Sequence, residues 1–417
     1  MIKLNSSLKF PRILIHSLYF HPELTGISKY SGEMVEWLVK NNYQCTVVTA
    51  FPFYPYWQIQ QPYKNGFYKK ESSSNKMLTV YRCPLYVPAK PTGLTRILHD
   101  ASFFISSFFV FIKLLFDKKY DIIISVAPPF HLGYAALFYR FFRGGKIVYH
   151  IQDLQVDMAR ELNMIKSPIL LSVLEKLEKY IIRKVDVVSS ISPGMIAKIK
   201  AKAEREILSF PNWANINNYF PITNKAEIKQ EWGFKPEDKI VLYSGNIGEK
   251  QGLEQILNVA FQFKQNAAIK FIICGTGAYK EVLLNMAKQM QLTNLTFLPL
   301  QANEVFNRFL NLADLHLILQ KKDASDLVMP SKLTTILAVG GLVLATANPN
   351  TSLYNEIKNN NIGILALPEN DDLLYQAIEN ALLNQNTSIK ENARKYAEKN
   401  ISLDGIMQQF LFNLDLK

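Results

Sequence analysis

The chain has 417 residues, which predicts two or three domains at the usual size of roughly 150 residues and excludes a single small module. Hydrophobic residues make up 48% and charged residues 20%, so neither a disordered chain nor a polytopic membrane protein fits. The net charge of +12 favours an anionic partner: nucleic acid, acidic lipid or a phosphorylated small molecule.

Cysteine usage and the opening segment indicate the compartment. Cys45, Cys83 and Cys274 are too widely spaced for a zinc knuckle or a disulfide framework. Charged residues and a proline interrupt the first apolar stretch, which has no small-residue cleavage pattern and does not resemble a signal peptide. We therefore expect a cytoplasmic protein.

Short β-branched segments alternate with longer amphipathic segments along the first half of the chain. Strands are expected at 12–18, 45–51, 121–127, 146–153 and 186–192. This alternation is typical of a parallel sheet with crossover helices, and therefore of an α/β domain.

The pattern restarts after an irregular segment rich in Pro, Asn and aromatic residues. Further strands are expected at 239–245, 269–275, 295–300, 314–320, 342–348 and 362–368. We predict a Rossmann-like domain over 1–209, a linker over 210–225 and a second Rossmann-like domain over 226–417, with a last helix able to pack back on the first domain. Two doubly wound domains facing each other would place their ligands in the cleft between them.

One segment, 97–116, does not fit this alternation. It is about long enough to span a bilayer, but His99, Asp100 and Lys113 interrupt it. Three interpretations stay open: a helix partly buried in the first domain, a helix that binds a membrane surface, and a membrane span, which the cost of intramembrane charge disfavours.

Turns rich in glycine follow two strands of the second half. GNIGEKQG at 245–252 places Gly245, Gly252 and Lys250 around a turn that leads into a helix, where amide groups and a lysine can hold phosphate oxygens. Gly275 and Gly277 form a second turn that lacks the third glycine of the dinucleotide fingerprint, which argues against hydride transfer. Ordinary tight turns are the alternative for both segments.

A third helix start carries a serine and a lysine. In MPSKLTTILAVGG, Ser331 can cap the helix or bind an anion, and Lys332 adds a cation there. Together with the turn at 245–252, this pattern favours a diphosphate clamp. A capped helix with a solvated lysine is the alternative.

The first half offers polar residues at two strand ends. Glu23, Thr25 and Lys29 lie on a loop entering a helix, and His150 and Asp153 lie at the end of a later strand. Carboxylates and an imidazole there could orient hydroxyl groups or accept a proton, although His150 could equally be a packed core residue. The remaining histidines show no ligand spacing, so we assign no metal.

Several enzyme classes are excluded because their motifs are missing. The chain contains no Walker A sequence, no G-x-S-x-G elbow and no H-E-x-x-H. Short basic and aromatic stretches do not belong to a recognisable nucleic-acid module, so we expect no nucleic-acid partner.

The order of the longer motifs resembles a known family. HPELTGISKYSGEMVEWL, HIQDLQVD, FPNW, LYSGNIGEKQGLE and MPSKLTTILAVGG are similar to the WcaI-like bacterial exopolysaccharide glycosyltransferases of colanic acid biosynthesis, within retaining family 4. The resemblance implies the GT-B fold, with an acceptor-binding first domain, a nucleotide-sugar-binding second domain, and anomer-retaining transfer without a metal or other cofactor.

The resemblance also implies roles for particular residues. The Gly26 loop would approach the donor phosphates and the acceptor, and Glu23, Thr25 and Lys29 would lie on the acceptor side. The donor would be bound by residues of the second domain: Gly245, Asn246, Lys250, Gly252, Gly275, Gly277, Ser331 and Lys332. The candidate catalytic residues are His150, Asp153, Lys250 and Lys332.

Some positions depart from the pattern of the wider family. Many members carry an arginine at the position of Asn246, a histidine at that of Gln152, and a glutamate pair at the positions of Leu327 and Thr335. The donor-sugar contact therefore cannot be carried over, and the role of His150 is open.

The main hypothesis is a hexosyltransferase that moves a sugar from a nucleotide diphosphate sugar to a saccharide acceptor. The resemblance suggests GDP-fucose as donor and a lipid-linked acceptor at the inner face of the cytoplasmic membrane, where the protein would bind peripherally. Two alternatives stay open: a GT-B sugar-nucleotide epimerase, and a noncatalytic scaffold of a polysaccharide assembly complex.

Overall fold

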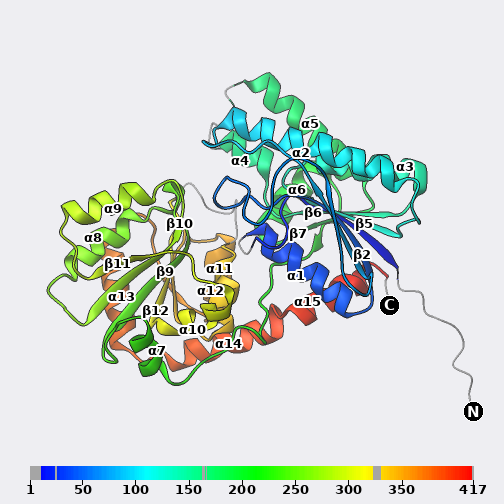
Figure 1. Cartoon of the computed structure of the whole chain (residues 1–417). Helices are drawn as coiled ribbons and strands as arrows, with labels where there is room; N and C mark the ends of the chain where they lie inside the picture. The colour runs from blue at the N-terminus through cyan, green and yellow to red at the C-terminus, as the bar shows by residue number, and fades with distance from the viewer. Residues whose placement is uncertain (1–10, 24–25, 162–164, 166, 323–329, 416–417) are drawn as a thin grey trace, which may run out of the picture. The chain divides into compact units, whose positions relative to one another are not determined.

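The computed structural model describes residues 11–23, 26–161, 165, 167–322 and 330–415. The chain folds as two compact units, Met1–Phe210 and Pro211–Lys417 (Figure 1). Each unit contains its own sheet. This arrangement confirms the prediction of an α/β protein built from two Rossmann-like units.

The first unit contains an eight-stranded sheet in the order β3-β4-β2-β1-β5-β6-β7-β8. Its strands are β1 (Arg12–His16), β2 (Gln44–Ala50), β3 (Lys69–Ser72), β4 (Leu78–Cys83), β5 (Ile122–Ala127), β6 (Lys146–Ile151), β7 (Val187–Ser190) and β8 (Leu208–Ser209). Only β3, at the edge, pairs antiparallel among the described strands. The central strands are buried on both faces, which explains their near-continuous apolar sequences.

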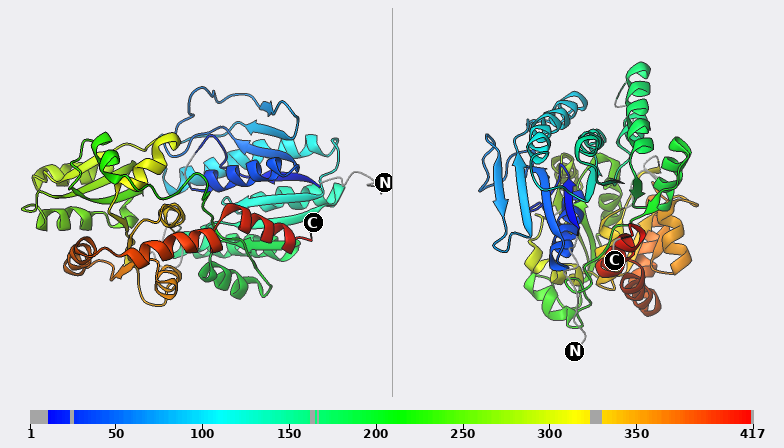
Figure 2. Two further views of the ribbon diagram at one scale, coloured as in Figure 1. Left: turned by 90° about the horizontal axis from the view of Figure 1, so that it is seen from below. Right: turned by 90° about the vertical axis from the view of Figure 1, so that its right-hand side faces the viewer.

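In the described part of this unit, the helices that connect these strands are α1 (Ile27–Lys40), α2 (Gly93–Leu114), α3 (Leu132–Arg143), α4 (Gln155–Glu161), α5 (Pro168–Lys184) and α6 (Pro193–Ala203). Local sequence fixes several of their starts. The Ser192 hydroxyl accepts a hydrogen bond from the Met195 amide ahead of Pro193, and Thr92 forms a capping box with Thr95 at the start of α2. Helices α2 and α5 lie on the same side of the unit, and α3 contacts both (Figures 1 and 2).

The second unit contains a six-stranded sheet in the order β11-β10-β9-β12-β13-β14, and every described strand pair is parallel. The strands are β9 (Lys239–Asn246), β10 (Ile269–Thr276), β11 (Leu295–Leu298), β12 (Leu315–Ile318), β13 (Val343–Thr346) and β14 (Ile364–Ala366). The helices are α7 (Lys225–Glu231), η1 (Glu249–Gln251), α8 (Glu254–Gln262), α9 (Lys280–Gln289), α10 (Asn303–Leu312), α11 (Lys332–Ala338), α12 (Ser352–Asn360), α13 (Asp371–Leu383), α14 (Thr387–Asn400) and α15 (Leu403–Asn413).

Each sheet reverses its strand order once. In the first unit β1 pairs with β2 on one side and with β5 on the other. In the second unit β9 plays the same part between β10 and β12. Such switch points leave a crevice at the carboxyl ends of the strands, where doubly wound sheets bind their ligands.

The segment 97–116 forms most of α2. By length and composition this helix could cross a membrane, the only one among the described residues to meet that test. Of the residues in its most apolar stretch, 44% are buried within the protein. Phe103 and Phe111, for example, are fully buried in the first unit, so α2 is in part a core helix.

Candidate active site

The carboxyl ends of β9 and β10 lie side by side in the second unit. Gly245 pairs with Gly275 in the register of these strands. A Cβ atom on Gly275 would lie 1.9 Å from the Gly245 carbonyl oxygen, and one on Gly277 would lie 2.1 Å from the Ile247 carbonyl oxygen. Because no side chain fits between the turns at these positions, only glycine allows this close approach.

Lys332 begins α11 and reaches the same edge of the sheet. Its Nζ atom lies 3.5 Å from the centre of the Tyr243 ring, and a Cβ atom on Gly245 would lie 3.4 Å from it. The Tyr243 hydroxyl donates a 2.7 Å hydrogen bond to the Asn246 carbonyl, which fixes the ring beneath the amine. Tyr243 thus supports Lys332 through a cation–π contact.

The Lys332 amine is buried and has no hydrogen-bond partner in the described part of the chain. Burial lowers the pKa of Lys332 to about 7, because the charged form loses its hydration without gaining an anion. A buried polar group without a partner is costly, so this arrangement favours binding of an anionic ligand that supplies one.

Other residues predicted on the donor side occupy the same region or border it. Gly252 closes η1 with a left-handed φ of 64°, and Asn246 is the exposed last residue of β9. Ser331 precedes α11, but its side chain does not make the capping hydrogen bond that the sequence allowed. Lys250 lies in η1, and its side chain is outside the described part of the structure.

Lys321 is a basic residue of this edge that the sequence analysis missed. It follows β12, and its Cγ atom lies 3.3 Å from the position of a Cβ atom on Gly252. The signal that could have found Lys321 is its position: it directly follows the strand predicted at 314–320, which the structure pairs with β9. Leu327 lies outside the described residues, whereas Thr335 is buried within α11.

Glu23 joins two loops of the first unit. Its carboxylate accepts hydrogen bonds from the amides of Phe53 (2.6 Å) and Tyr54 (2.7 Å) and from the Ser28 hydroxyl (2.9 Å). Burial raises the pKa of Glu23 to about 7 despite these donors. The structure therefore places Glu23 as an internal brace rather than as a group free to hold an acceptor.

The other residues predicted on this loop have different settings. Gly26 caps α1 with a positive φ of 59°, and a Cβ atom there would meet nothing within 4 Å. Burial lowers the pKa of Lys29, whose ammonium group lies 5.2 Å from the centre of the Tyr30 ring. Thr25 lies outside the described residues.

His150 lies inside the sheet. Its ring is 2% exposed, with Nδ1 3.0 Å from the Ser189 hydroxyl and its centroid 4.9 Å from that of Phe210. Burial lowers the pKa of His150 to about 3, so the imidazole is neutral at physiological pH. His150 is therefore a packed core residue, and we propose no catalytic role for it.

A second polar cluster lies around the switch point of the first unit. Asp100 on α2 accepts a 2.8 Å hydrogen bond from the Gln155 amide, and Gln155 Oε1 accepts one of 3.1 Å from the Phe130 amide. Burial raises the pKa of Asp100 to about 7. Gln155 thus connects α2 to the segment that follows β5.

Two tyrosines belong to the same cluster. Burial, and after it the charge of Asp100, raises the pKa of the Tyr19 hydroxyl. Burial, and after it the charge of Asp153, raises the pKa of Tyr54. Tyr19 follows β1 and Asp153 follows β6, so these groups gather at the carboxyl edge of the sheet, where hydroxyls and carboxylates can bind a polyhydroxylated ligand.

Among the described residues, no three His, Cys, Asp or Glu side chains gather into a set that could hold a metal ion.

Comparison with known proteins gives a family match for each half of the chain. Residues 25–213 match the family model "Glycosyl transferase 4-like domain", and residues 224–400 match "Glycosyl transferases group 1". The chain is 37% identical over 412 residues to the "Putative colanic acid biosynthesis glycosyl transferase WcaI" of Escherichia coli K12, covering 96% of this chain and 98% of WcaI. It is 25% identical over 271 residues to the "Probable glycosyltransferase WbjE" of Pseudomonas aeruginosa, covering 63% of this chain and 66% of WbjE.

Solved structures show the same fold at low sequence identity. Sucrose-phosphate synthase from Thermosynechococcus elongatus has a TM-score of 0.77 at 15% identity, covering 97% of this chain and 98% of that one. Anabaena HepE, solved in complex with UDP-glucose, has a TM-score of 0.69 at 14% identity, covering 97% and 99%.

Two Rossmann-like units, each with polar groups at its switch point, together with these likenesses define a glycosyltransferase of the GT-B fold. The chain belongs to the glycosyltransferase family of WcaI, which confirms the resemblance inferred from its motifs.

Proposed function

We propose that this protein transfers a hexosyl group from a nucleotide diphosphate sugar to a saccharide acceptor during synthesis of an exopolysaccharide of the colanic acid type. The observation that carries the proposal is the buried amine of Lys332 at the β9 edge, which has no hydrogen-bond partner among the residues that the structure describes. The name of the relative WcaI supports the polymer class, and GDP-fucose is the first donor to test.

The donor diphosphate would lie across the ends of β9 and β10. Turns that carry glycine at Gly245, Gly275 and Gly277 allow close approach of the main chain, and Lys332 supplies a cation. HepE, which has the same fold, was solved in complex with UDP-glucose, and this supports a nucleotide diphosphate sugar as the class of donor. Lys250 and Lys321 are further basic residues of the region that could assist.

Lys332 would act by stabilising the leaving group. When the bond from the anomeric carbon to the diphosphate breaks, negative charge grows on the departing oxygen, and a preorganised cation in a dry site lowers the energy of that state. A bound diphosphate would also raise the pKa of Lys332 from about 7, so donor binding would bring a proton to the amine.

The acceptor would lie at the switch point of the first unit. Tyr19, Asp100 and Asp153 offer hydroxyl and carboxylate oxygens suited to a sugar hydroxyl. The new bond would form between that hydroxyl oxygen and the anomeric carbon. Its proton would pass to the departing phosphate, giving retention of configuration with no metal and no cofactor.

The acceptor would be a lipid-linked saccharide at the inner face of the cytoplasmic membrane. The apolar helix α2, which also carries Asp100, supports this part of the proposal.

A panel of nucleotide sugars tests the donor assignment. Purified protein is heated with GDP-fucose, GDP-mannose, UDP-glucose or UDP-galactose, and the expected result is a rise in melting temperature with one of them, because a ligand that binds the folded state stabilises it. Lys332→Met should lose that rise. No rise with any donor would contradict the proposal.

Two further measurements separate the alternatives. Incubation of the protein with donor alone should leave the sugar unchanged, whereas an isomerised sugar would indicate an epimerase. Donor binding without turnover on a lipid extract from polymer-producing cells would indicate a noncatalytic scaffold.

A further inference from the structure

Helix α2 presents a continuous apolar stripe to solvent. Its exposed members lie on one side of the helix, at spacings close to one or two helical turns, with Ile97 beside Leu98: Leu94, Ile97, Leu98, Ile105, Phe109, Ile112 and, just after the helix, Phe116. Phe109 is 60% exposed and Phe116 is 87% exposed. The opposite side, with Phe103 and Phe111, is buried in the first unit. Helix α2 therefore lies along the surface of this unit, with one side exposed and the other packed in the core.

The stripe continues onto two neighbouring helices. Phe108 of α2 lies 4.6 Å from Phe138 of α3 between ring centroids, and Tyr134 of α3 stacks on Tyr180 of α5 at 6.1 Å. We call the exposed apolar residues of these three helices the outer face. They are Leu94, Ile97, Leu98, Ile105, Phe109, Ile112 and Phe116 with α2, Phe141 and Phe142 on α3, and Ile169, Leu170, Val173, Leu177 and Tyr180 on α5.

The outer face is a patch of a kind that soluble proteins rarely expose. Single exposed apolar residues are common, but contiguous ones across three helices usually mark a surface that binds a partner or a membrane. Phe141 is 83% exposed and Ile169 is 77% exposed, so these side chains are available for such contact.

Basic residues surround the outer face. The stretches 93–119, 132–143 and 168–184 contain ten Lys and Arg against four Asp and Glu. All four of those carboxylates are engaged within the unit: Asp100 with Gln155, Asp117 with Arg12, Glu175 with Arg160 and Glu178 with Lys202. The charge presented outward is therefore predominantly positive.

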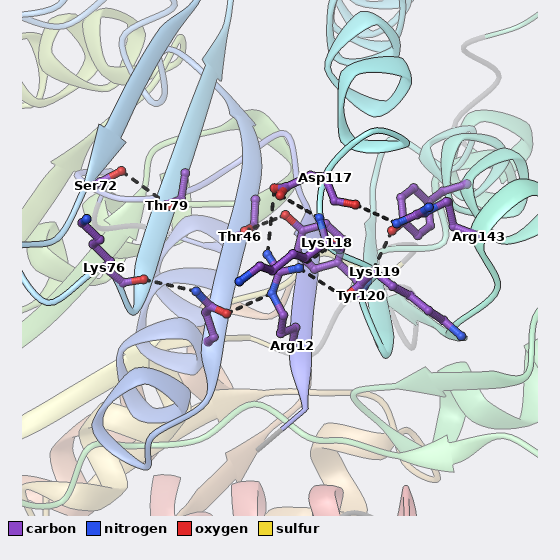
Figure 3. A network of polar contacts seen from close by, with 12 residues as sticks. Arg12, Thr46, Ser72, Lys76, Thr79, Asp117, Lys118, Lys119, Tyr120 and Arg143 are labelled. Atoms are coloured by element: carbon purple, nitrogen blue, oxygen red, sulfur yellow. Dashed lines mark hydrogen bonds and ion pairs between the residues drawn. The ribbon is translucent and has the colours of Figure 1, made fainter. Parts of the chain in front are cut away.

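Two arginines stabilise the turn after α2, which carries part of this positive charge. Arg12 donates to the Lys119 carbonyl at 3.2 Å, and Arg143 donates to the Asp117 carbonyl at 2.7 Å (Figure 3). These main-chain contacts fix the turn, while the residues Lys118 and Lys119 remain exposed beside Phe116.

We propose that the outer face docks on a bilayer that contains anionic lipid, with the aromatic side chains in the headgroup region and the lysines on the phosphates. Apolar side chains framed by lysines match both parts of such a surface, whereas a protein partner would need acidic groups around an apolar centre. The inference rests on the proposed lipid-linked acceptor and names the surface that would meet it.

The same helix connects docking to the acceptor site. Asp100 projects from α2 toward Gln155 near the switch point, while Leu98 and Ile105 of that helix face solvent. A bilayer bound to the outer face would therefore lie beside the polar cluster that we assign to the acceptor.

Vesicle binding tests the proposal without any need for a substrate. The full chain is mixed with vesicles of phosphatidylcholine, or of an equimolar mixture with phosphatidylglycerol, and the bound fraction is measured by flotation. We expect binding to the anionic vesicles that weakens in high salt. In the triple variant Ile105→Ser, Phe109→Ser, Phe141→Ser, the affinity for anionic vesicles should fall by about tenfold or more, because three apolar side chains that would enter the bilayer are lost.

Two matched variants complete the test. Replacement by serine of Phe261, Leu383 and Phe412, which are exposed apolar residues of the second unit, should leave vesicle binding unchanged. Lys118→Gln with Lys119→Gln should weaken binding to anionic vesicles by about fivefold per lysine. Circular dichroism and the melting temperature establish that each variant is folded.

The proposal would be overturned if the wild type did not bind anionic vesicles, or if the wild type and the outer-face triple variant bound them equally. It would also be overturned if light scattering showed a dimer of the wild type that the triple variant loses, because the outer face would then bind a second copy of the chain. Retention of the donor-induced rise in melting temperature in the triple variant shows that a docking failure is separate from any failure of the proposed enzymatic activity.

Discussion

The amine of Lys332 lies 3.5 Å above the centre of the Tyr243 ring, buried and with no hydrogen-bond partner among the described residues. The ring offers only a weak attraction for a cation, which does not replace the hydration that burial removes. The second unit thus holds a basic group at the β9 edge whose charge is incompletely compensated until an anion binds.

Replacement of this amine should separate catalysis from folding. Lys332→Met keeps the apolar stem and removes the nitrogen. We expect the transfer rate to fall by about 100-fold or more, because a preorganised charge at the leaving group is lost. The free energy of unfolding should stay the same or rise by about 1 kcal/mol, because an unpaired buried group is removed. Steady-state kinetics and urea denaturation measure the two effects. A wild-type rate in the folded variant would contradict the diphosphate clamp.

Donor binding should take up a proton above neutral pH. The pKa of Lys332 is lowered from 10.5 to about 7 in the folded protein, so at pH 8 the amine is largely neutral and a bound diphosphate would recharge it. Calorimetric titration of GDP or UDP in buffers of different ionisation enthalpy should show uptake of about one proton in the wild type. Lys332→Met is the control, and equal proton uptake in both proteins would refute this role.

The same shift predicts how stability depends on pH. Between about pH 7 and 10.5 the unfolded chain binds more protons at this position than the folded chain, so the free energy of unfolding rises with pH there. Below pH 7 both states are protonated and the penalty is complete. The stability gap between Lys332→Met and the wild type should therefore narrow as the pH rises from 7 to 10. A gap that does not change with pH would show that the amine keeps its ordinary pKa.

Asp100 should affect the acceptor and not the donor. Asp100→Asn keeps the shape and the contact with Gln155 but removes the carboxylate, so we expect roughly tenfold slower transfer to a lipid-linked acceptor extract, through misplacement of the acceptor hydroxyl. The donor-induced rise in melting temperature should be unchanged. Asp117→Asn, an exposed carboxylate after α2, is the matched control and should transfer normally. Equal rates for both variants would remove Asp100 from the acceptor site.

Glu23 should matter for stability first. Glu23→Ala leaves the amides of Phe53 and Tyr54 buried without their acceptor, and we expect a loss of roughly 2–4 kcal/mol in the free energy of unfolding. Glu36→Ala removes an exposed contact with His21 and should cost about 1 kcal/mol or less. Urea denaturation compares the two. Equal small losses would show that the Glu23 brace does not form in solution.

Much of the fold could be predicted because its central strands are buried on both faces. Segments such as 121–127 are mostly apolar, and their alternation with helices allows only a few strand topologies. The hairpin of β3 and β4 was missed because β3, KKES, is a polar and mostly exposed edge strand.

The candidate site was only partly predictable. Glycine turns and Lys332 follow strands directly, so their place at a sheet edge follows from chain order. Asp100 is different, because in sequence it only interrupts an apolar helix, and its meeting with Gln155 depends on strand order and packing. His150 shows the converse: it comes near a strand end, yet β5 and β7 flank β6, and neighbouring Ser189 and Phe210 enclose the ring.

The glycine contacts at the β9 and β10 ends limit how this protein can diversify. At Gly275 and Gly277 the atoms that a ligand would contact belong to the main chain, and a point mutation does not change the chemistry of main-chain groups. A substitution there can only damage the turns. Any retuning toward a different sugar or base must therefore come from residues around these turns, so that engineering of the donor preference should leave both glycines intact.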